Sequence, residues 1–316
     1  MDAALRALER AQTTAHGDVA DDADDGVRVT STSATGRRGN ARDDARELMR
    51  ACDALTTTYR ARLTRSALGA RVLACIERGS RAALDVGRID VAERACEVLG
   101  EACAPTSSRR AAARAATLEA QGDVAQAENI YNDVLKENEC DVRARKGLIA
   151  CARSKGATEE ARNALIAYVE TFGADADAWY ELGHIYAESG AYDECLFCYE
   201  EVLLAMPHSA DAHRRMAEVL YTMGGETRVR EAKNHFAAAL DFTTGKDARA
   251  LYGVVLCAKA LRRMKASKKD TKSDTKSDDD GAALADAAAE RLLQRYAVEH
   301  EALLAIVRPQ LRGALA

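Results

Sequence analysis

The chain has 316 residues, a length that accommodates about two ordinary domains or one elongated repeat array. Apolar residues make up 47% and aromatic residues only 5%, with three prolines, a composition that favours closely packed helices over strands. The formal net charge of −5 lacks the strongly basic character that nucleic-acid binding requires, so we expect no nucleic-acid partner.

Residues 1–44 are predicted to form a largely disordered, acidic and polar arm. From about residue 16 onward, Asp, Gly, Ser and Thr predominate, so little apolar surface could be buried to offset the entropy of ordering. The opening sequence MDAALRALERAQ has no apolar core of the kind found in secretory signals. The longest strongly apolar stretch, residues 251–261, is about half of what a membrane span needs. We therefore expect a soluble chain with no direct membrane span.

Residues 45–263 are predicted to form an array of helix pairs. Gly122, Gly156, Gly190 and Gly224 recur at intervals of 34 residues, each between two helical patterns. A repeat of this length indicates a solenoid, in which each helix pair buries its apolar face against its neighbours. Glycine suits the turn because the residue after a helix often needs a positive φ. The clearest repeats span about 108–141, 142–175, 176–209 and 210–246.

One repeat, DAWYELGHIYAESGAYDECLFCYEEVLLAMP, matches the tetratricopeptide pattern W-x2-L-G-x2-Y, A-x3-F, P. Gly183 and Cys195 are small where two antiparallel helices should approach closely, whereas bulky aromatic side chains should fill the spaces between layers. The sequence therefore predicts an all-α fold, a tetratricopeptide-repeat α-solenoid built as a superhelix of antiparallel helix pairs. The predicted packing residues are Trp179, Leu182, Gly183, Tyr186, Cys195, Tyr199, Pro207, Ala232 and Phe236.

The following repeat departs from the pattern. Ala232 and Phe236 stand three residues late, which predicts a short insertion in the turn at residues 224–226. Residues 264–281 alternate Lys and Asp in a low-complexity sequence typical of a solvated linker. Residues 282–308 are predicted to form one C-terminal helix, which Pro309 should end.

Cys195 and Cys198 form a C-x2-C pair that could in principle bind metal or do redox chemistry. No second C-x2-C or close His pair follows at zinc-ligand spacing, and a thioredoxin-type site would need a preceding strand. Both cysteines fall inside a predicted helix, so we interpret them as buried, reduced core thiols. We expect no metal site and no cofactor.

The histidines do not point to catalysis either. His184, His208, His213 and His235 are dispersed over several repeats, and none has an identifiable nucleophile and orienting carboxylate beside it. The sequence TTGKD at residues 243–247 resembles the end of a phosphate-binding loop, but no buried strand precedes it. We therefore predict no catalytic residue and no enzymatic activity.

The remaining candidate site is the inner face of the solenoid, formed by the first helix of each pair. Basic, mixed and aromatic side chains there would suit a polypeptide ligand with some acidic character, although they could also be an ordinary solvated helix face. Ala150, Glu181 and His184 stand where a clamp for chaperone C-termini would need asparagines, so that ligand is not expected. The residues predicted to line this protein-binding groove are Arg143, Lys146, Arg153, Asp177, Tyr180, His184, Glu188, Arg214, Glu218 and Tyr221.

Between about residues 73 and 261 the sequence resembles a known family. The motifs AALDVGRIDVAERACEVL, FCYEEVLLAMPH and YTMGG are similar to those of subunit 2 of the endoplasmic reticulum membrane protein complex, also called tetratricopeptide repeat protein 35. In that resemblance, YTMGG marks a three-residue insertion before a shortened second helix. The arm and the Lys/Asp linker are not similar to the family.

The resemblance implies a non-catalytic scaffold at the cytoplasmic face of the endoplasmic reticulum membrane, held there peripherally by its partners. It further implies an insertase that places transmembrane helices of tail-anchored and multi-pass proteins. The implied partners are the cytosolic parts of membrane subunits such as 3 and 5, and a soluble subunit of the 8/9 type. Two other hypotheses stay open, a free co-chaperone or assembly adaptor of the same fold, and a zinc or thiol enzyme that uses Cys195 and Cys198.

Overall fold

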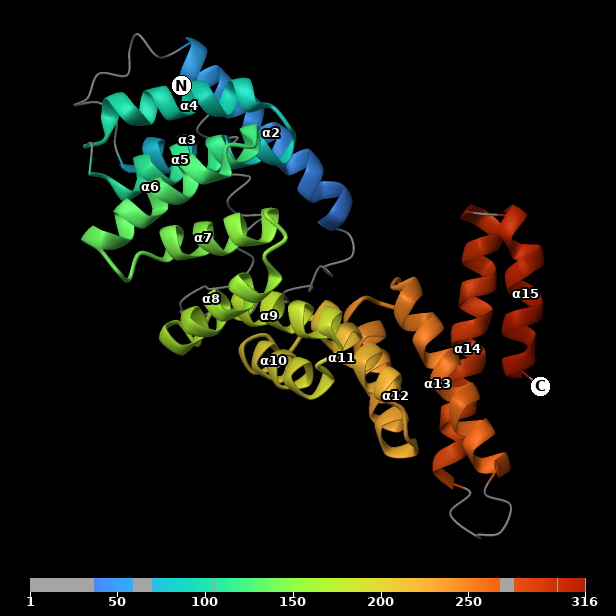
Figure 1. Ribbon diagram of the computed structural model, residues 1–316. Helices are drawn as coiled ribbons and strands as arrows, with labels where there is room; N and C mark the ends of the chain where they lie inside the picture. Colours follow the sequence, from blue (N-terminus) through green and yellow to red (C-terminus); the bar gives the residue numbers. More distant parts are fainter. Residues whose placement is uncertain (1–36, 59–69, 105, 268–275, 300, 316) are drawn as a thin grey trace, which may run out of the picture. The chain divides into compact units, whose positions relative to one another are not determined.

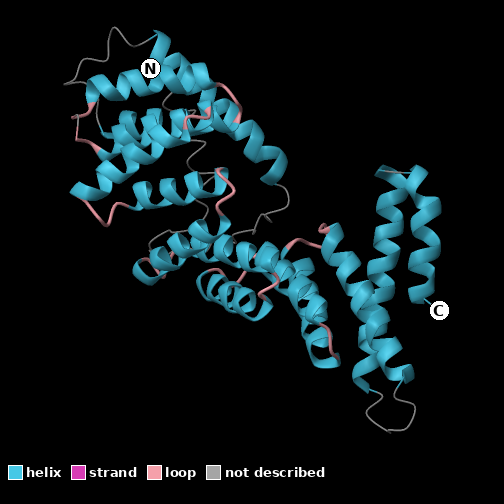
Figure 2. Ribbon diagram, in the orientation of Figure 1, coloured by secondary structure: helices cyan, strands magenta, loops and turns pink. Residues whose placement is uncertain are grey.

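The computed structural model describes residues 37–58, 70–104, 106–267, 276–299 and 301–315 (Figure 1). Within these residues the regular structure consists of fourteen helices and no strand (Figure 2). This confirms the predicted all-α fold. Most of the predicted N-terminal arm lies outside the described residues, as do residues 268–275 of the predicted linker.

The contacts divide the chain into two compact units, one ending at Tyr168 and the other beginning at Val169. The division falls within α8 (Thr158–Thr171). The other helices of the first unit are α2 (Arg37–Thr58), α3 (Ala70–Asp85), α4 (Ile89–Ala102), α5 (Ser108–Gln121), α6 (Val124–Glu137) and α7 (Val142–Ser154). Those of the second are α9 (Ala176–Ser189), α10 (Tyr192–Ala205), α11 (Ala210–Met223), α12 (Glu226–Phe242), α13 (Ala248–Ser267), α14 (Lys276–Glu299) and α15 (Glu301–Leu315).

The turn within a helix pair depends on a glycine with positive φ. Gly122 follows α5 with φ 90°, and the next two backbone N–H groups close the helix: Gly122 N donates to Glu119 O and Asp123 N to Leu118 O. Gly190 ends α9 in the same way with φ 77°. A residue with a side chain rarely adopts this conformation, which explains why glycine recurs at the period of the array.

A short polar side chain caps the start of α7, α9 and α11. Asp141 accepts a hydrogen bond from Ala144 N before α7, Asp175 from Ala178 N before α9, and Ser209 from Ala212 N before α11. Such a cap satisfies a backbone N–H that has no partner inside the helix. These polar residues between repeats therefore help to define where α7, α9 and α11 begin.

Aromatic side chains pack onto glycines of neighbouring helices. A Cβ added to Gly147 of α7 would overlap the ring of Tyr131 of α6, and one added to Gly253 of α13 would overlap Phe236 of α12. Because these glycines have no side chain, each ring lies directly on the facing helix backbone. The small residues thus allow close helix packing in both units.

The insertion near residue 224 was predicted in the turn, and that prediction is wrong. The turn before α12 contains only Gly224 and Gly225, both with positive φ, while α12 begins at Glu226. With 17 residues, α12 is longer than α10, which has 14. The extra residues therefore add a turn to the second helix. Val229 in this turn is buried, and the burial of its apolar side chain stabilises the longer helix.

Three predicted element boundaries also differ from the structure. Helix α2 already begins at Arg37, inside the predicted arm, and α13 and α14 extend into the predicted linker. The single C-terminal helix is replaced by α14 and α15, and Pro309 lies inside α15 instead of ending it. The buried side chain of Leu311 offsets the backbone hydrogen bond that proline cannot form, because it packs into the core of the second unit.

Candidate protein-binding surface

The first helices of successive pairs lie against one another within each unit. In the first unit α3 contacts α5 and α5 contacts α7, and in the second unit α11 contacts α13 (Figure 1). Side chains at the same position of successive first helices therefore come together although they are about 34 residues apart in sequence. This is the surface on which the predicted groove residues should lie.

In the first unit, three arginines converge on one carboxylate. Glu77 of α3 has a side chain only 10% exposed, and its oxygens lie 2.9 Å from Arg109 Nε of α5 and 3.1 Å from Arg143 Nε of α7. Arg81 adds a third guanidinium at 3.5 Å. Positive charge is in excess here, since three guanidinium groups face a single carboxylate. Of these residues, sequence reasoning identified only Arg143.

The other two predicted residues of the first unit also lie on α7. Lys146 Nζ lies 5.6 Å from the centroid of the Tyr168 ring, a distance suited to a cation–π interaction. Arg153 is exposed near the end of α7. The α7 face is therefore basic along its length, with Arg143 tied to the buried carboxylate.

In the second unit, Arg214 was predicted to face a ligand, and the structure contradicts this. Its side chain is 4% exposed; Nη1 donates to Glu218 Oε1 at 2.6 Å, Nη2 pairs with Asp211, and Nε lies 3.3 Å from Asp247 Oδ2. A buried guanidinium needs such partners, because an unpaired charge away from water is costly. Arg214 therefore links α11 to the start of α13 instead of offering a free cation.

The neighbouring Tyr180 is also engaged inside the unit. Its hydroxyl donates to Asp211 and accepts from Arg215 Nε at 3.3 Å, while its ring lies 5.7 Å from the ring of Tyr199. Burial, together with the bond to Asp211, raises the pKa of Tyr180, so this hydroxyl stays protonated. Tyr221 is half-buried against the same core.

The remaining predicted groove residues lie nearer the solvent. Asp177 and Glu188 are exposed on α9, and His184 Nδ1 lies 3.2 Å from Glu188 Oε1. Glu218 bridges Arg214 and Arg215. The first-helix face of the second unit is thus rich in carboxylates, unlike the basic face of the first unit.

Most of the predicted packing residues are buried. This holds for Leu182, Gly183, Cys195, Tyr199, Ala232 and Phe236. Tyr186 is half-buried against the core, and Trp179 is half-buried with its Nε1 donating to Gly173 O at 2.8 Å. Pro207 is exposed in the turn before α11, where its carbonyl oxygen lies 3.1 Å from His213 Nε2.

The thiols of the C-x2-C pair are held away from solvent. Cys195 Sγ donates to Gly183 O at 3.1 Å, which ties α10 to α9. Burial raises the pKa of Cys195 to about 11 and that of Cys198 to about 12, so both thiols are protonated at neutral pH. Thiolates are the nucleophilic and metal-binding form, so this pair suits packing better than chemistry. In the described part of the chain, no three His, Cys, Asp or Glu side chains are arranged to hold a metal ion.

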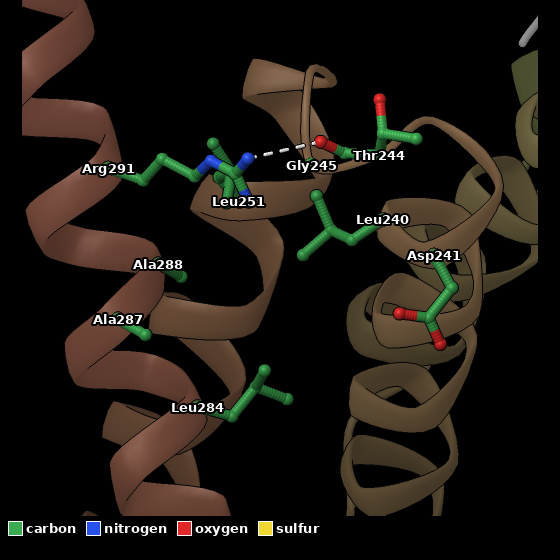
Figure 3. A pocket seen from close by; sticks show the side chains of 9 residues that line it. All are labelled: Leu240, Asp241, Thr244, Gly245, Leu251, Leu284, Ala287, Ala288 and Arg291. Carbon is green, nitrogen blue, oxygen red and sulfur yellow. Dashed lines mark hydrogen bonds between the residues drawn. The ribbon is translucent and has the colours of Figure 1, made fainter.

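A pocket of about 360 Å³ opens where α12, α13 and α14 meet (Figure 3). Leu240, Leu251 and Leu284 form apolar walls, and Arg291 Nη2 at the rim donates to Thr244 O at 3.2 Å. That bond closes the TTGKD segment as a helix-to-helix turn between α12 and α13. The pocket offers an apolar surface with polar groups at its edge.

Comparison with known proteins identifies the repeat domain. Residues 102–229 match the profile of the EMC2 TPR-like repeat domain. The match covers less than half of the chain, so the similarity concerns this segment. The segment contains α5 to α11 complete, together with both faces described above except Glu77, Arg81 and Asp247.

Similar proteins extend the likeness beyond the domain. ER membrane protein complex subunit 2-A of Xenopus laevis is 32% identical over 191 residues, which cover 60% of this chain and 64% of the relative. The chain thus spans less than two thirds of that relative's length. TPR repeat protein oca3 of Schizosaccharomyces pombe is 24% identical over 63% of this chain and 71% of its own.

A solved structure supports the fold of the chain. The C-terminal part of a TPR repeat-containing protein from Cytophaga hutchinsonii aligns with 84% of this chain and 96% of its own, at a TM-score of 0.54 and 14% identity. At that identity the likeness concerns the fold alone. The chain is a tetratricopeptide-repeat α-solenoid, as the sequence predicts.

Proposed function

We propose that this chain is a non-catalytic scaffold subunit of the ER membrane protein complex that supports insertion of transmembrane helices of tail-anchored and multi-pass proteins. The match of residues 102–229 to the EMC2 TPR-like repeat domain carries the proposal. The buried, protonated thiols of Cys195 and Cys198 agree with a binding role instead of a chemical one.

The proposed location is the cytoplasmic face of the endoplasmic reticulum membrane, with peripheral attachment through partners. In the described residues no helix has both the length and the apolar composition to cross a bilayer. The proposed partners are the cytosolic segments of membrane subunits such as 3 and 5, and a soluble subunit of the 8/9 type.

The first-helix faces are the proposed contact surfaces for these partners. The basic face of the first unit, with Arg109 and Arg143 around Glu77, suits acidic segments. The carboxylates of the second unit suit basic ones. Opposite charge at the two faces would select partners by their charge pattern and speed their association.

A tagged pull-down from gently solubilised microsomes tests the proposal. The tagged chain should co-purify with membrane subunits of the complex, and purification without any of them would overturn it. The double variant Arg109→Gln, Arg143→Gln should lose partners that bind the first unit. Lys136→Gln is a matched control, because Lys136 is exposed on the second helix α6 and pairs with the exposed Asp133.

The basic face of the first unit also favours a second candidate, a free co-chaperone or assembly adaptor that binds acidic peptides. Cell fractionation separates the two functions. A scaffold of the complex should sediment with microsomes, whereas a free adaptor should stay in the supernatant.

A further inference from the structure

Helix α10 presents large apolar side chains to solvent. Phe197 is 54% exposed and Leu204 is 76% exposed, and Met206 just beyond the helix is 41% exposed. Phe197 and Leu204 are seven residues apart, which places them on the same side of an α-helix two turns apart. We call these three residues the α10 apolar strip.

The strip is held rigidly in place. On the opposite side of α10, Cys195, Cys198, Tyr199 and Val202 are buried in the helix pair. Phe197 also packs edge-on against Trp179 of α9, with ring centroids 5.8 Å apart. The exposed side chains therefore cannot turn inward without unpacking the core, and they stay available to a partner.

Carboxylates border the strip on both sides. At 3.6 residues per turn, Glu194 and Glu201 lie along one side of the line from Phe197 to Leu204, and Asp193 and Glu200 lie along the other. The surrounding sequence is also acidic, because residues 173–213 contain nine Asp and Glu and no Lys or Arg. An apolar line between two acidic borders is thus the chemical character of this surface.

We propose that the α10 apolar strip docks a cationic amphipathic helix of a partner protein. Such a helix would place apolar residues at i, i+3 or i+4, and i+7 against Phe197 and Leu204, and its Lys or Arg residues beside the bordering carboxylates. An anionic bilayer surface is disfavoured because the same carboxylates would be repelled by it. The inference goes beyond the proposed function, which uses first helices, since α10 is the second helix of its pair.

Binding of model peptides to the full chain tests this inference. A fluorescent amphipathic helix of leucine and lysine should bind, followed by anisotropy, and a peptide with the same leucines and glutamate in place of lysine should not. The double variant Phe197→Ser, Leu204→Ser should weaken binding by roughly tenfold or more, as expected for central apolar anchors. Val298→Ser is the matched control, because Val298 is an apolar side chain 87% exposed on α14.

A second pair of variants tests the charges separately. Glu200→Gln with Glu201→Gln should weaken binding and reduce its dependence on salt, whereas Asp133→Asn on α6 should change neither. Helix content by circular dichroism shows that each variant is folded. Equal binding of the two peptides, or unchanged binding by the Phe197 and Leu204 variant, would overturn the proposal. So would binding of phosphatidylserine vesicles that is lost in that variant, because a bilayer would then be the occupant.

Discussion

Nδ1 of His213 on α11 lies 2.9 Å from Nδ1 of His235 on α12. At this distance one nitrogen donates a proton and the other accepts it, so at least one of the two rings is neutral. Nε2 of His213 lies 3.1 Å from Pro207 O, which can only accept, so this nitrogen carries a proton. The pair therefore joins the two helices of one repeat through a hydrogen bond. Protonation of both rings would break this bond, because no acceptor nitrogen would remain.

The first prediction follows from this pair. Burial and the neighbouring His213 lower the pKa of His235, against a smaller opposite effect of Glu231. Below the usual histidine pKa of about 6.5 the unfolded chain then binds more protons than the folded one, so the free energy of unfolding should fall as the pH drops through that range. Urea denaturation at pH 7.5 and pH 5.5 measures the change.

Variants identify the group responsible for that pH dependence. His235→Gln should lose less stability than the wild type between the two pH values, because glutamine does not titrate. His208→Gln, whose ring is exposed beside Phe242, should keep the wild-type pH dependence. An identical pH dependence in His235→Gln would contradict the role given to this histidine.

The second prediction concerns the close approach of α9 and α10. A Cβ added to Gly183 would lie 3.0 Å from Tyr199 Cε1 and 3.2 Å from Cys198 Cβ, so Gly183→Leu should force the helices apart. Overpacking of this kind costs about 1–3 kcal/mol of unfolding free energy. Thermal or urea denaturation measures it.

A glycine whose Cβ would make only ordinary van der Waals contact provides the comparison. A Cβ at Gly100 of α4 would meet nothing closer than the side chain of Arg110 at 3.7 Å. Gly100→Ala should therefore be neutral or stabilise the protein by up to about 1 kcal/mol, since alanine is the better helix former. If both variants lowered stability equally, close packing at Gly183 would not be the cause.

The third prediction concerns the carboxylate that gathers three arginines. Glu77→Gln removes the single negative charge among Arg81, Arg109 and Arg143 and leaves their charges to repel one another. We expect a loss of about 1–3 kcal/mol, less than for a fully buried pair because the arginines reach solvent. Equilibrium urea unfolding measures this loss.

Asp133→Asn breaks an exposed ion pair with Lys136 and serves as the control. Its cost should stay below about 1 kcal/mol. High salt should reduce the difference in unfolding free energy between wild type and Glu77→Gln only slightly, because the carboxylate is shielded from solvent. A cost for Glu77→Gln as small as that of the control would show that the cluster adds little to stability.

The fourth prediction concerns thiol reactivity. Of the nine cysteines, Cys140 is exposed, whereas Cys52, Cys195, Cys198 and Cys257 are buried with pKa values raised by burial to between about 11 and 12. A thiol reagent at neutral pH should therefore modify Cys140 first. Mass spectrometry after brief labelling identifies the modified residue.

Two controls accompany the labelling. Cys140→Ser should remove the fastest reacting thiol, and denaturant should make all nine cysteines reactive. Rapid native labelling of Cys195 or Cys198 would instead support the thiol-enzyme hypothesis that the C-x2-C spacing left open.

The repeat period made the fold predictable. Glycines such as Gly122 and Gly190 lie at positive φ after their helices, so each spacing of 34 residues reports a local backbone requirement. Such requirements involve only a few neighbouring residues, which is why they can be read from the sequence. The same locality explains the error at α12, because three extra residues fit the pattern equally well in the turn or in the helix.

The repeat pattern could not predict which charged side chains face a ligand and which are buried. Arg143 and Arg214 were both predicted to face a ligand, yet Arg214 is buried among Asp211, Glu218 and Asp247. The sequence did contain an indication that Arg214 is paired internally. Asp211 follows Arg143 by two repeat lengths and occupies the same position on its helix, so an acidic residue stands one turn before Arg214. Whether such a residue faces a ligand or its own neighbours depends on what the adjacent helix carries.

The sequence alone therefore determined the class of structure, the helix pairs and the residues small enough to lie between them. Only the tertiary structure decided that Glu77 collects arginines from three helices, that Arg214 is internal, and that Phe197 and Leu204 remain exposed. The physical reason is the sequence separation over which each interaction acts. Helix formation and turns depend on residues within one or two turns of each other, whereas ion pairing and exposure depend on helices brought together from distant parts of the chain.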